Sequence, residues 1–397
     1  MDSGNRKSTN LFATCLAAWA IVGYSQPTLL PTAIVLIGGL ALLFLTTLSD
    51  FKRLAVPTLP LLLCVAAVAS MFWAEVSGGG PRALLFAVVT LSGVAVGNFL
   101  APREAMRIFD YGLRVTALAS FALWVVFPEL AIDQGRASHG TLLGIYPHKN
   151  SLSAMLLLGV VTLLNRTKPD VSRQSKIAWT VFYVVLMAFS KSATALGLLL
   201  LCAVLNVIVR SWRRLSPFSR TLSLLAYLGA TFLIVVFLLS RSDEILGVFG
   251  RDSTLSGRSR IWEGTYYAWK LRPLFGYGWW VAFDERSEAS RTIYQFTQWY
   301  VPNAHNSFLT MLLFLGLFGM VLLVAFSLAV LFRCLLGLVR NFTLEGSWQL
   351  QIVTIFILHS LFDSWLDKTY WFLMVLISVW SIRYGKSRME SPKLELL

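Results

Sequence analysis

The sequence predicts an all-α membrane protein with about twelve transmembrane helices. Apolar residues make up 56% of the 397-residue chain, charged residues only 14%, and the apolar residues fall into long runs. A soluble domain carries about 25% charged residues, so the composition excludes a cytosolic enzyme. A chain this apolar and this rich in aromatic residues is not disordered either.

A helix that crosses the hydrocarbon core needs roughly 17 to 25 predominantly apolar residues. Twelve runs approach this pattern: 11–25, 29–48, 54–73, 83–100, 108–127, 148–165, 177–190, 193–209, 221–240, 306–331, 348–362 and 370–384. The spans of a transmembrane β-barrel alternate in polarity over about ten residues, which these runs do not. The runs predict nine helices with short loops in 1–240, a loop domain in 241–305, three helices in 306–384 and a cytoplasmic tail in 385–397.

Lysine and arginine are distributed unevenly between the two sides of this predicted topology. With an even number of spans and the N-terminus inside, the inside segments carry 20 of these residues and the short outside segments carry 5. Cytoplasmic loops of membrane proteins accumulate Lys and Arg, so both termini are expected in the cytoplasm. The lipid bilayer therefore accounts for the net charge of +14, and no nucleic-acid partner is needed.

The predicted outside loop 241–305 is 65 residues long and is too rich in sequence features to be a simple connection. It carries eight cations, seven anions, five Trp and five Tyr. Structureless loops of this length are uncommon in compact domains. We expect a helix lying at the membrane interface over 256–272, which Ser256 or Ser259 can cap and Pro273 stops.

His305 is the candidate catalytic residue. It stands just before the run 306–331, and Asn303 can cap the helix there, which would place His305 in the first turn. A helix N-terminus disfavours a protonated imidazole, so we expect a neutral histidine that can accept a proton. Further along the helix, Gly316 and Gly319 would share its face and allow close helix approach. A histidine that merely caps or hydrogen-bonds at the interface is the alternative.

Arg258 and Arg260 open the predicted interfacial helix. Backbone N–H groups at a helix start, together with a guanidinium group, form an anion site that would suit a diphosphate. The alternative is that these arginines pair with lipid phosphates or with Glu263.

Four more cationic or imidazole side chains lie on the predicted outside face. His148 and Lys149 stand where a span enters the membrane, Arg136 lies upstream in the same loop, and Lys191 lies in a hairpin that is too tight to leave the membrane fully. Such a lysine is costly unless it is paired or faces water, and snorkelling to the headgroups is the alternative.

Two further groups of polar residues give weaker signals. Asp110 and Arg114 are spaced i, i+4 in one span and can pair, and His359, Asp363 and Asp367 lie near an outer helix end. The sequence has no histidine pair with metal-ligand spacing and no phosphate-binding glycine motif. We therefore expect neither a metal nor a cofactor.

Five short motifs, in this order along the chain, resemble those of the O-antigen ligase and polymerase superfamily (Wzy-type). They are Pro147-His-Lys-Asn150, Ser190-Lys-Ser192, Leu255-Ser-Gly-Arg258-Ser-Arg-Ile-Trp262, Pro273-Leu-Phe-Gly276-Tyr-Gly278, and His305-Asn306 followed by Gly316-Leu-Phe-Gly319. The first two look like the exopolysaccharide branch of the superfamily, the ExoQ-like polymerases. The chain departs from the family pattern at Ser256, where Thr is common, and at Lys191, near where ligases often have Arg. The second departure disfavours a ligase more than a polymerase.

The resemblance implies a GT-C-like membrane glycosyltransferase that uses an undecaprenyl-diphosphate-linked glycan on the periplasmic side of a bacterial inner membrane, without sugar nucleotide or metal. His305, helped by Asn306, would orient and deprotonate the acceptor hydroxyl, and attack opposite the departing diphosphate would invert the anomeric carbon. The expected substrate-binding residues are Arg258, Arg260, Lys191, Arg136, Asn306, His148 and Lys149.

The expected function is polymerisation of lipid-linked repeat units into exopolysaccharide, with a chain-length regulator or an export protein as a further partner. An O-antigen ligase, which transfers the glycan to lipid A core, is the nearest alternative. A transporter or flippase would show repeated halves and charges at mid-membrane, whereas here the polar candidates gather on one face. A non-catalytic scaffold is the third alternative.

Overall fold

The computed structural model describes residues 54–135, 140–167, 170–226, 229, 258–364 and 369–390. The described part of the chain is built from helices, and its one strand-like pairing is an isolated bridge between Ile132 and Leu142. The helices are α3 (Thr58–Ala69), η3 (Ser70–Phe72), α4 (Gly80–Phe99), α5 (Pro102–Val126), α6 (Pro128–Ala131), α7 (Lys149–Asn165), α8 (Arg173–Ser190), α9 (Ala193–Ser211), η4 (Trp212–Arg214), α12 (Arg258–Leu271), α13 (Glu288–Thr297), α14 (Ser307–Arg340), α15 (Leu344–Ser360) and α16 (Thr369–Glu390).

The all-α fold class is confirmed, and nine of the twelve predicted apolar runs coincide with described helices. The runs 11–25 and 29–48 lie outside the described residues, as does most of 221–240. Four described helices, α4, α5, α9 with η4, and α14, are long and apolar enough to cross a membrane. α16 continues to Glu390, into the segment 385–397 predicted as a tail. Twelve spans remain a prediction.

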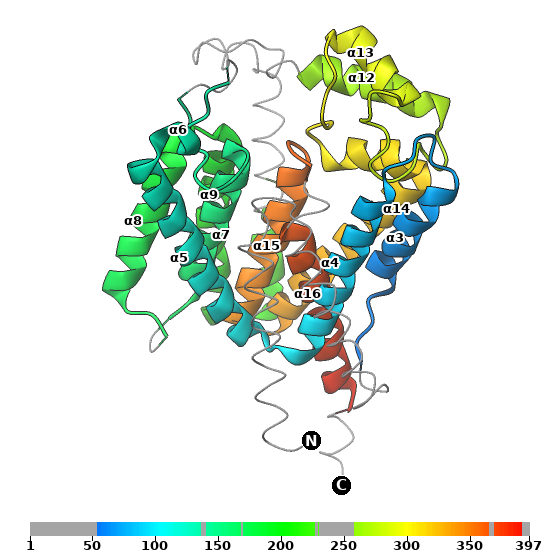
Figure 1. The fold of residues 1–397 in the computed structure, drawn as a ribbon. Coiled ribbons are helices and arrows are strands. Elements are labelled where there is room, and N and C mark those ends of the chain that lie inside the picture. The colour runs from blue at the N-terminus through cyan, green and yellow to red at the C-terminus, as the bar shows by residue number, and fades with distance from the viewer. Residues whose placement is uncertain are drawn as a thin grey trace, which may run out of the picture.

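The helices form two groups that are joined by a central pair. Figure 1 shows α5 to α9 on one side, α3, α4 and α14 on the other, and α15 and α16 between them. α7 packs against α5, α8 and α9, α4 packs against α3 and α16, and α15 packs against both α7 and α14. The α12–α13 pair lies at one end of the bundle, at the top of Figure 1. We call residues 258–304 the cap.

One face of helix α8 is apolar and exposed. Ile177, Val181, Val185 and Phe189 are between 45% and 56% exposed and follow one another every fourth residue. This spacing places them on one face of the helix. A soluble protein would bury such a stripe, so its exposure is what a helix that contacts lipid requires.

Two glycines bring α4 and α16 into close contact. Gly93 and Gly97 stand four residues apart on α4, and a Cβ added to either would lie 3.0 Å or less from Val375 or Val379 of α16. This small-xxx-small spacing lets two membrane helices approach until their backbones nearly touch. Van der Waals contact along this seam holds the central pair to the α3–α4 group.

A buried carboxylate ties α5 to the end of α7. Asp110 is fully buried and accepts hydrogen bonds from Arg114, at 3.0 Å from its Nε, and from Arg166. The i, i+4 pair predicted from the sequence is therefore confirmed, and a second arginine joins it. Removing Asp110 would leave Arg114 and Arg166 without the carboxylate that compensates them, which costs several kcal/mol.

Helix α14 is broken at Gly316. Its 34 residues would measure about 50 Å as one straight helix, whereas the hydrocarbon core is about 30 Å thick. Gly316 has φ 64° and ψ −157°, which interrupts the helix and separates a first part, 307–315, from a second part, 317–340. The two parts run in different directions in Figure 1. The single straight span predicted from residue 306, with His305, Gly316 and Gly319 on one face, is therefore wrong.

The turn 273–278 of the cap fills the break in α14 with reciprocal backbone hydrogen bonds. The N–H groups of Tyr277 and Gly278 donate to the carbonyls of Leu313 (2.8 Å) and Phe314 (3.0 Å), and those of Leu317 and Phe318 donate to the carbonyls of Pro273 (2.8 Å) and Leu274 (3.2 Å). A helix break frees backbone groups that must find partners inside a membrane protein. Two sequence motifs, Pro273–Gly278 and Gly316–Gly319, therefore form one interlocked structure.

Replacing Gly316 with Ala should disrupt this interlock. Its φ and ψ lie in a region that is essentially restricted to glycine, and an added Cβ would lie 2.3 Å from the backbone of Leu274. We expect a loss of about 3 kcal/mol or more in the free energy of unfolding, read as a lower thermal midpoint in detergent. Gly337→Ala is the matched control, because nothing lies within 4 Å of a Cβ there on the same helix. Equal midpoints for the two variants would contradict the interlock.

Candidate functional site

The cap contains two packed helices, of which the sequence predicted one. α12 covers most of the expected 256–272 helix and ends before Pro273, as predicted, while α13 was not foreseen. Ser256 lies outside the described residues. The two helices approach closely at Gly264, where an added Cβ would lie 3.0 Å from the Cα of Ile293.

Glu75, in the loop before α4, makes polar and ionic contacts with the end of α12 and the start of α13. The carboxylate of Glu75 accepts hydrogen bonds from the hydroxyl of Ser287 (3.2 Å) and the N–H of Glu288 (3.1 Å), which starts α13. Arg272, which follows α12, lies 3.9 Å from Glu75 and 3.6 Å from Glu288. The cap is thus anchored both at α14 and at the loop between α3 and α4.

His305 lies directly before α14 and not in its first turn. Asn306 is the N-cap of α14, because its side-chain oxygen accepts from the N–H groups of Phe308 (2.9 Å) and Leu309 (3.1 Å). Asn303, which the sequence analysis took as the cap, instead accepts from the N–H of His305 at 2.8 Å. That turn holds His305 at φ 49°, in the left-handed region. The expectation that Asn303 caps the helix and that His305 lies in its first turn is therefore wrong.

Asp363 stands opposite the imidazole. Its Oδ1 lies 3.8 Å from Nδ1 of His305, and the two side chains are 9% and 22% exposed. This Nδ1 is buried and has no hydrogen-bond partner among the described residues. Catalytic hydrogen bonds are often long before substrate binds and shorten in the complex. The pair therefore has the composition and the approximate geometry of a base and the carboxylate that orients it.

The position of Asp363 is fixed by the start of α14. The side-chain amide of Asn306 donates to the carbonyl of Leu361 (3.1 Å), and the hydroxyl of Ser307 donates to the carbonyl of Asp363 (2.9 Å). The hydroxyls of Thr310 and Ser364 lie 2.9 Å apart. The segment after α15 is thus held to α14, so the imidazole and the carboxylate belong to one rigid unit.

Arg258, the first residue of α12, lies near enough to Asp363 to be affected by its charge. Burial lowers the pKa of its guanidinium group below the ordinary value, while the negative charge of Asp363 acts in the opposite direction. The indole N–H of Trp262, one turn further along α12, donates to the carbonyl of Ala304 at 3.0 Å. This contact ties α12 to the residue that precedes His305. His305 therefore faces Asp363 directly, and Arg258 lies within the electrostatic influence of the same carboxylate.

Arg260 does not share the position of Arg258. It is exposed, whereas Arg258 is half-buried, and residues two apart on a helix do not face the same side. The expectation that both arginines of this motif hold one diphosphate therefore fits Arg258 better than Arg260.

The motifs Pro147–Asn150 and Ser190–Ser192 form a second polar group, at the start of α7. His148 is the N-cap of α7, with its Nδ1 accepting from the N–H of Asn150 at 3.2 Å. The side-chain oxygen of Asn150 accepts from the hydroxyl of Ser192 at 3.1 Å, and the hydroxyls of Ser153 and Ser190 lie 2.5 Å apart. The Pro147–Asn150 and Ser190–Ser192 motifs are thus in direct contact, although they are 42 positions apart in sequence.

Lys191 and Lys149 are placed by this group. Lys191 lies between α8 and α9 with φ 52° and an exposed side chain, so the tight hairpin expected there is present. His148 is the N-cap of α7. Lys149 is therefore the first residue of the helix, and Pro147 lies outside it.

The structure forms two groups from the predicted site residues. His305, Asn306 and Arg258 lie with Asp363 on the α14 side, and His148, Lys149 and Lys191 lie on the α7 side. α15, which ends at Ser360, packs against both helices and so stands between the groups. Arg136 lies outside the described residues. A single pocket that contains all of these side chains remains a prediction.

Asp363 is the functional candidate that sequence reasoning undervalued. It was noticed only as one of three polar residues near a helix end, because it lies 58 positions from His305 in the chain. Within the described ranges, no three His, Cys, Asp or Glu side chains gather in a way that would hold a metal ion.

Comparison with known proteins matches a segment that carries four of the five motifs, all except Pro147–Asn150. Residues 177–324 match the family model described as O-antigen ligase. The exopolysaccharide production protein ExoQ of Rhizobium meliloti (strain 1021) is 33% identical over 144 residues, which are 33% of this chain and 32% of that protein. The match thus spans about a third of the length of this relative. The resemblance of this chain to the O-antigen ligase superfamily and its exopolysaccharide branch is therefore confirmed over the segment that runs from α8 into α14.

Proposed function

We propose that this protein is a membrane glycosyltransferase that polymerises undecaprenyl-diphosphate-linked oligosaccharide repeat units into exopolysaccharide. The observation that carries the proposal is the His305–Asp363 pair, whose atoms Nδ1 and Oδ1 lie 3.8 Å apart, with His305 inside the segment 177–324 that matches the O-antigen ligase model. Arg258, which is affected by the charge of the same carboxylate, supports it. A base and a cation at one carboxylate are the two groups that transfer from a lipid diphosphate needs.

His305 acts on the acceptor sugar. A sugar hydroxyl is a weak nucleophile at neutral pH and gains from a positioned base. Nδ1 of His305 faces Asp363, which leaves Nε2 to take the hydroxyl proton. The hydroxyl oxygen then forms a bond to the anomeric carbon of the donor while the bond from that carbon to the diphosphate oxygen breaks. Attack from the side opposite the diphosphate inverts the anomeric carbon.

Arg258 acts on the leaving group. The departing lipid diphosphate accumulates negative charge, and a fixed guanidinium group stabilises that charge without supplying a proton. Arg260, Lys191, Lys149 and Arg136 are further candidates to contact the diphosphate or the glycan. The reaction in this form uses neither a metal nor a cofactor.

The proposed orientation places this site on the periplasmic side of a bacterial inner membrane, with both termini in the cytoplasm. The cap and His305 lie at one end of the bundle, and the arginine-rich helix ends, which we analyse below, lie at the other. This arrangement agrees with the charge rule for cytoplasmic segments. A chain-length regulator or an export protein is the expected partner.

An O-antigen ligase would use the same residues with a different acceptor, lipid A core. The two functions separate in one experiment: purified protein in nanodiscs is incubated with lipid-linked repeat units alone or together with lipid A core. A polymerase makes a ladder of longer lipid-linked glycans without added core. A product that appears only when core is present would replace the polymerase assignment with the ligase.

His305→Ala should reduce polymer formation in this assay by about 10²- to 10⁴-fold, because the acceptor hydroxyl loses its base. Expression level and thermal midpoint should stay close to those of the wild type, since His305 caps no helix and its side chain is only partly buried. An unchanged rate of ladder formation would remove His305 from the reaction.

Asp363→Asn should lower kcat at least tenfold and leave KM for the lipid-linked donor nearly unchanged, because the amide keeps the shape but cannot orient and stabilise the imidazole as a carboxylate does. Glu263→Gln on α12 is the control for loss of a negative charge in the cap, since Glu263 is exposed. If both variants kept wild-type kcat, Asp363 would be a structural residue only.

Arg258→Ala should raise KM for the lipid-linked donor more than Arg258→Lys does, because lysine keeps the charge but loses the two-pronged guanidinium geometry. Lys270→Ala removes an exposed cation from the far end of the same helix and should leave KM unchanged. Steady-state kinetics with varied donor concentration measure the three variants. Identical KM values for Arg258→Ala and Lys270→Ala would exclude Arg258 from donor binding.

A further inference from the structure

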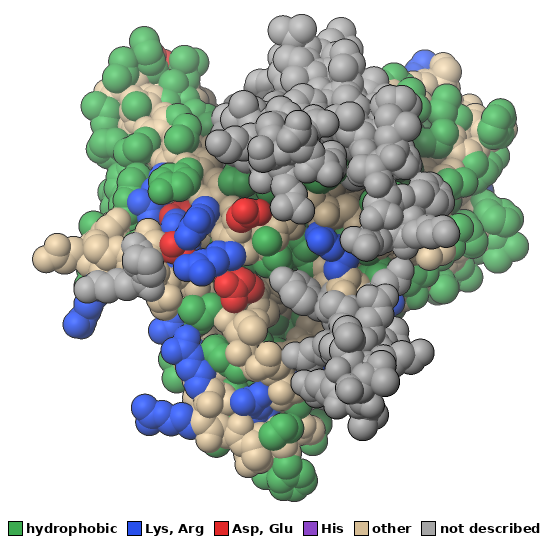
Figure 2. Space-filling view, turned by 90° about the horizontal axis from the view of Figure 1, so that it is seen from below, with side chains coloured by type: hydrophobic (Ala, Val, Ile, Leu, Met, Phe, Trp, Pro, Cys, Tyr) green, Lys and Arg blue, Asp and Glu red, His purple; other side chains and the backbone are tan. Residues whose placement is uncertain are grey.

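The end of the bundle opposite the cap carries many arginines and two cavities. Figure 2 shows this end, with Lys and Arg side chains gathered beside a few Asp and Glu. One cavity has a volume of ≈180 Å³ and the other ≈470 Å³, and both are lined in part by Leu344 and Glu345 at the start of α15. The two cavities differ in the charge of the residues that line them, and this difference indicates which of them suits an anionic ligand.

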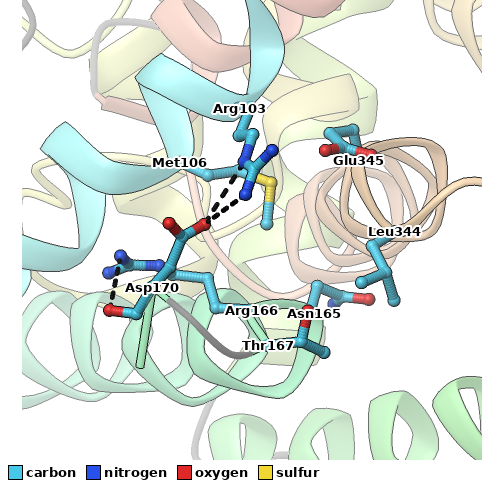
Figure 3. Close-up of a pocket in the computed structure, with 8 residues that line it drawn as sticks. All are labelled: Arg103, Met106, Asn165, Arg166, Thr167, Asp170, Leu344 and Glu345. Carbon is cyan, nitrogen blue, oxygen red and sulfur yellow. Dashed lines mark hydrogen bonds and ion pairs between the residues drawn. The ribbon is translucent and has the colours of Figure 1, made fainter. Parts of the chain in front are cut away.

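The smaller cavity has balanced charge. Figure 3 shows Arg103, Arg166, Asp170 and Glu345 around it. Asp170 accepts hydrogen bonds from Arg103 (3.2 Å) and Arg107 (2.5 Å). Burial raises the pKa of Asp170, but these bonds outweigh it and hold the pKa below its usual range. Its arginines are thus occupied by carboxylates of the chain, so this cavity has no excess charge to attract a ligand.

The larger cavity has an excess of positive charge. It is lined by Arg213 and Arg220, by the segment 341–344 and by Glu345. Arg214 and Arg340 stand next to these residues in the sequence and are exposed. Glu345 is the one acidic residue in the lining, so an anion entering the cavity meets a positive potential.

Both lining guanidinium groups are held in place. Arg220 donates from Nε to the carbonyl of Trp212 and from Nη1 to the carbonyl of Val339, each at 2.8 Å. Arg213 lies over the ring of Phe342, with its guanidinium carbon 5.0 Å from the ring centroid. Side chains that are already ordered lose little conformational entropy on binding, and a planar guanidinium group matches the oxygens of a phosphate.

The elements that border the larger cavity also expose apolar side chains. On the helical stretch 217–226, Phe218 and Leu222 are 78% and 59% exposed, and on α14, Phe332 and Leu328 are 61% and 57% exposed. These helices run from the cavity into the apolar body of the bundle. An anion with acyl chains would therefore find cations for its headgroup and apolar helix surface for its tails, whereas a soluble anion would use only the former.

We propose that the cavity lined by Arg213, Arg220 and residues 341–345 binds the phosphodiester headgroup of an anionic phospholipid. Basic pockets between membrane helices on the cytoplasmic side bind headgroups of this charge. The bound lipid would bridge η4, the end of α14 and the start of α15, and would therefore fix three helix ends that have few other charged partners at this point. This site is independent of the proposed glycosyl transfer, since it lies at the other end of the bundle from His305.

Native mass spectrometry of the full chain released from nanodiscs tests this proposal, with phosphatidylglycerol and phosphatidylcholine as probes. The wild type should retain phosphatidylglycerol about fivefold better than phosphatidylcholine, since an arginine near an anionic headgroup contributes roughly that factor. Arg213→Glu should abolish the preference, and Arg213→Gln should reduce it. Arg173→Glu is the matched control, because Arg173 is an exposed arginine that starts α8 and does not line the cavity.

Two outcomes would overturn the proposal. The first is equal retention of phosphatidylglycerol by Arg213→Glu and by Arg173→Glu. The second is displacement of phosphatidylglycerol by millimolar inorganic phosphate, which would mean that the cavity holds a soluble anion. Arg213 is exposed and contacts the ring of Phe342 from the surface, so the thermal midpoint of its variants should change little from that of the wild type. The readout does not involve polymer formation, so it stands or falls separately from the proposed enzyme activity.

Discussion

A helix that breaks within a membrane protein must find new partners for its backbone groups, and in this protein the cap provides them. The turn 273–278 and the break at Gly316 exchange four hydrogen bonds, each motif satisfying the other. Neither segment is stable without its counterpart, because the carbonyls and N–H groups that they share would otherwise be buried without partners. This interaction joins the cap to α14 and so helps to place α12 beside the start of α14, where His305 lies.

Much of the fold followed from composition and charge. Long apolar runs predicted the helices, since burial in lipid leaves few alternatives to a helix, and the distribution of Lys and Arg predicted which helix ends share a side. The described arginines at the ends of α7, α9 and α14 do gather at one end of the bundle. What sequence reasoning missed was α13, because its ten residues lie among turns and aromatic residues that indicated only an interfacial surface.

The sequence predicted only part of the candidate site, because a motif detects residues that are close together in the chain and misses residues that meet only in the fold. Arg258 and His305 could be singled out because each stands in a short local pattern. Asn303 and Asn306 are both good capping residues, so a local pattern cannot distinguish them; the hydrogen bond from Asn306 to the segment after α15 decides between them in the structure. Asp363 belongs to the site through tertiary contacts alone. Gly316 was interpreted as a small residue on a helix face, whereas its backbone conformation is what matters.

The length of the first part of α14 also sets the position of the imidazole relative to the break. It comprises 307–315, nine residues between the imidazole and the break, and it is fixed at one end by Asn306 and at the other by the turn 273–278. At 1.5 Å and 100° per residue, inserting one amino acid here would turn the start of α14, with the imidazole, about a quarter of the way around the helix axis relative to the turn 273–278. The number of residues between His305 and Gly316 therefore sets the direction of the imidazole about the helix axis as well as its distance from the break.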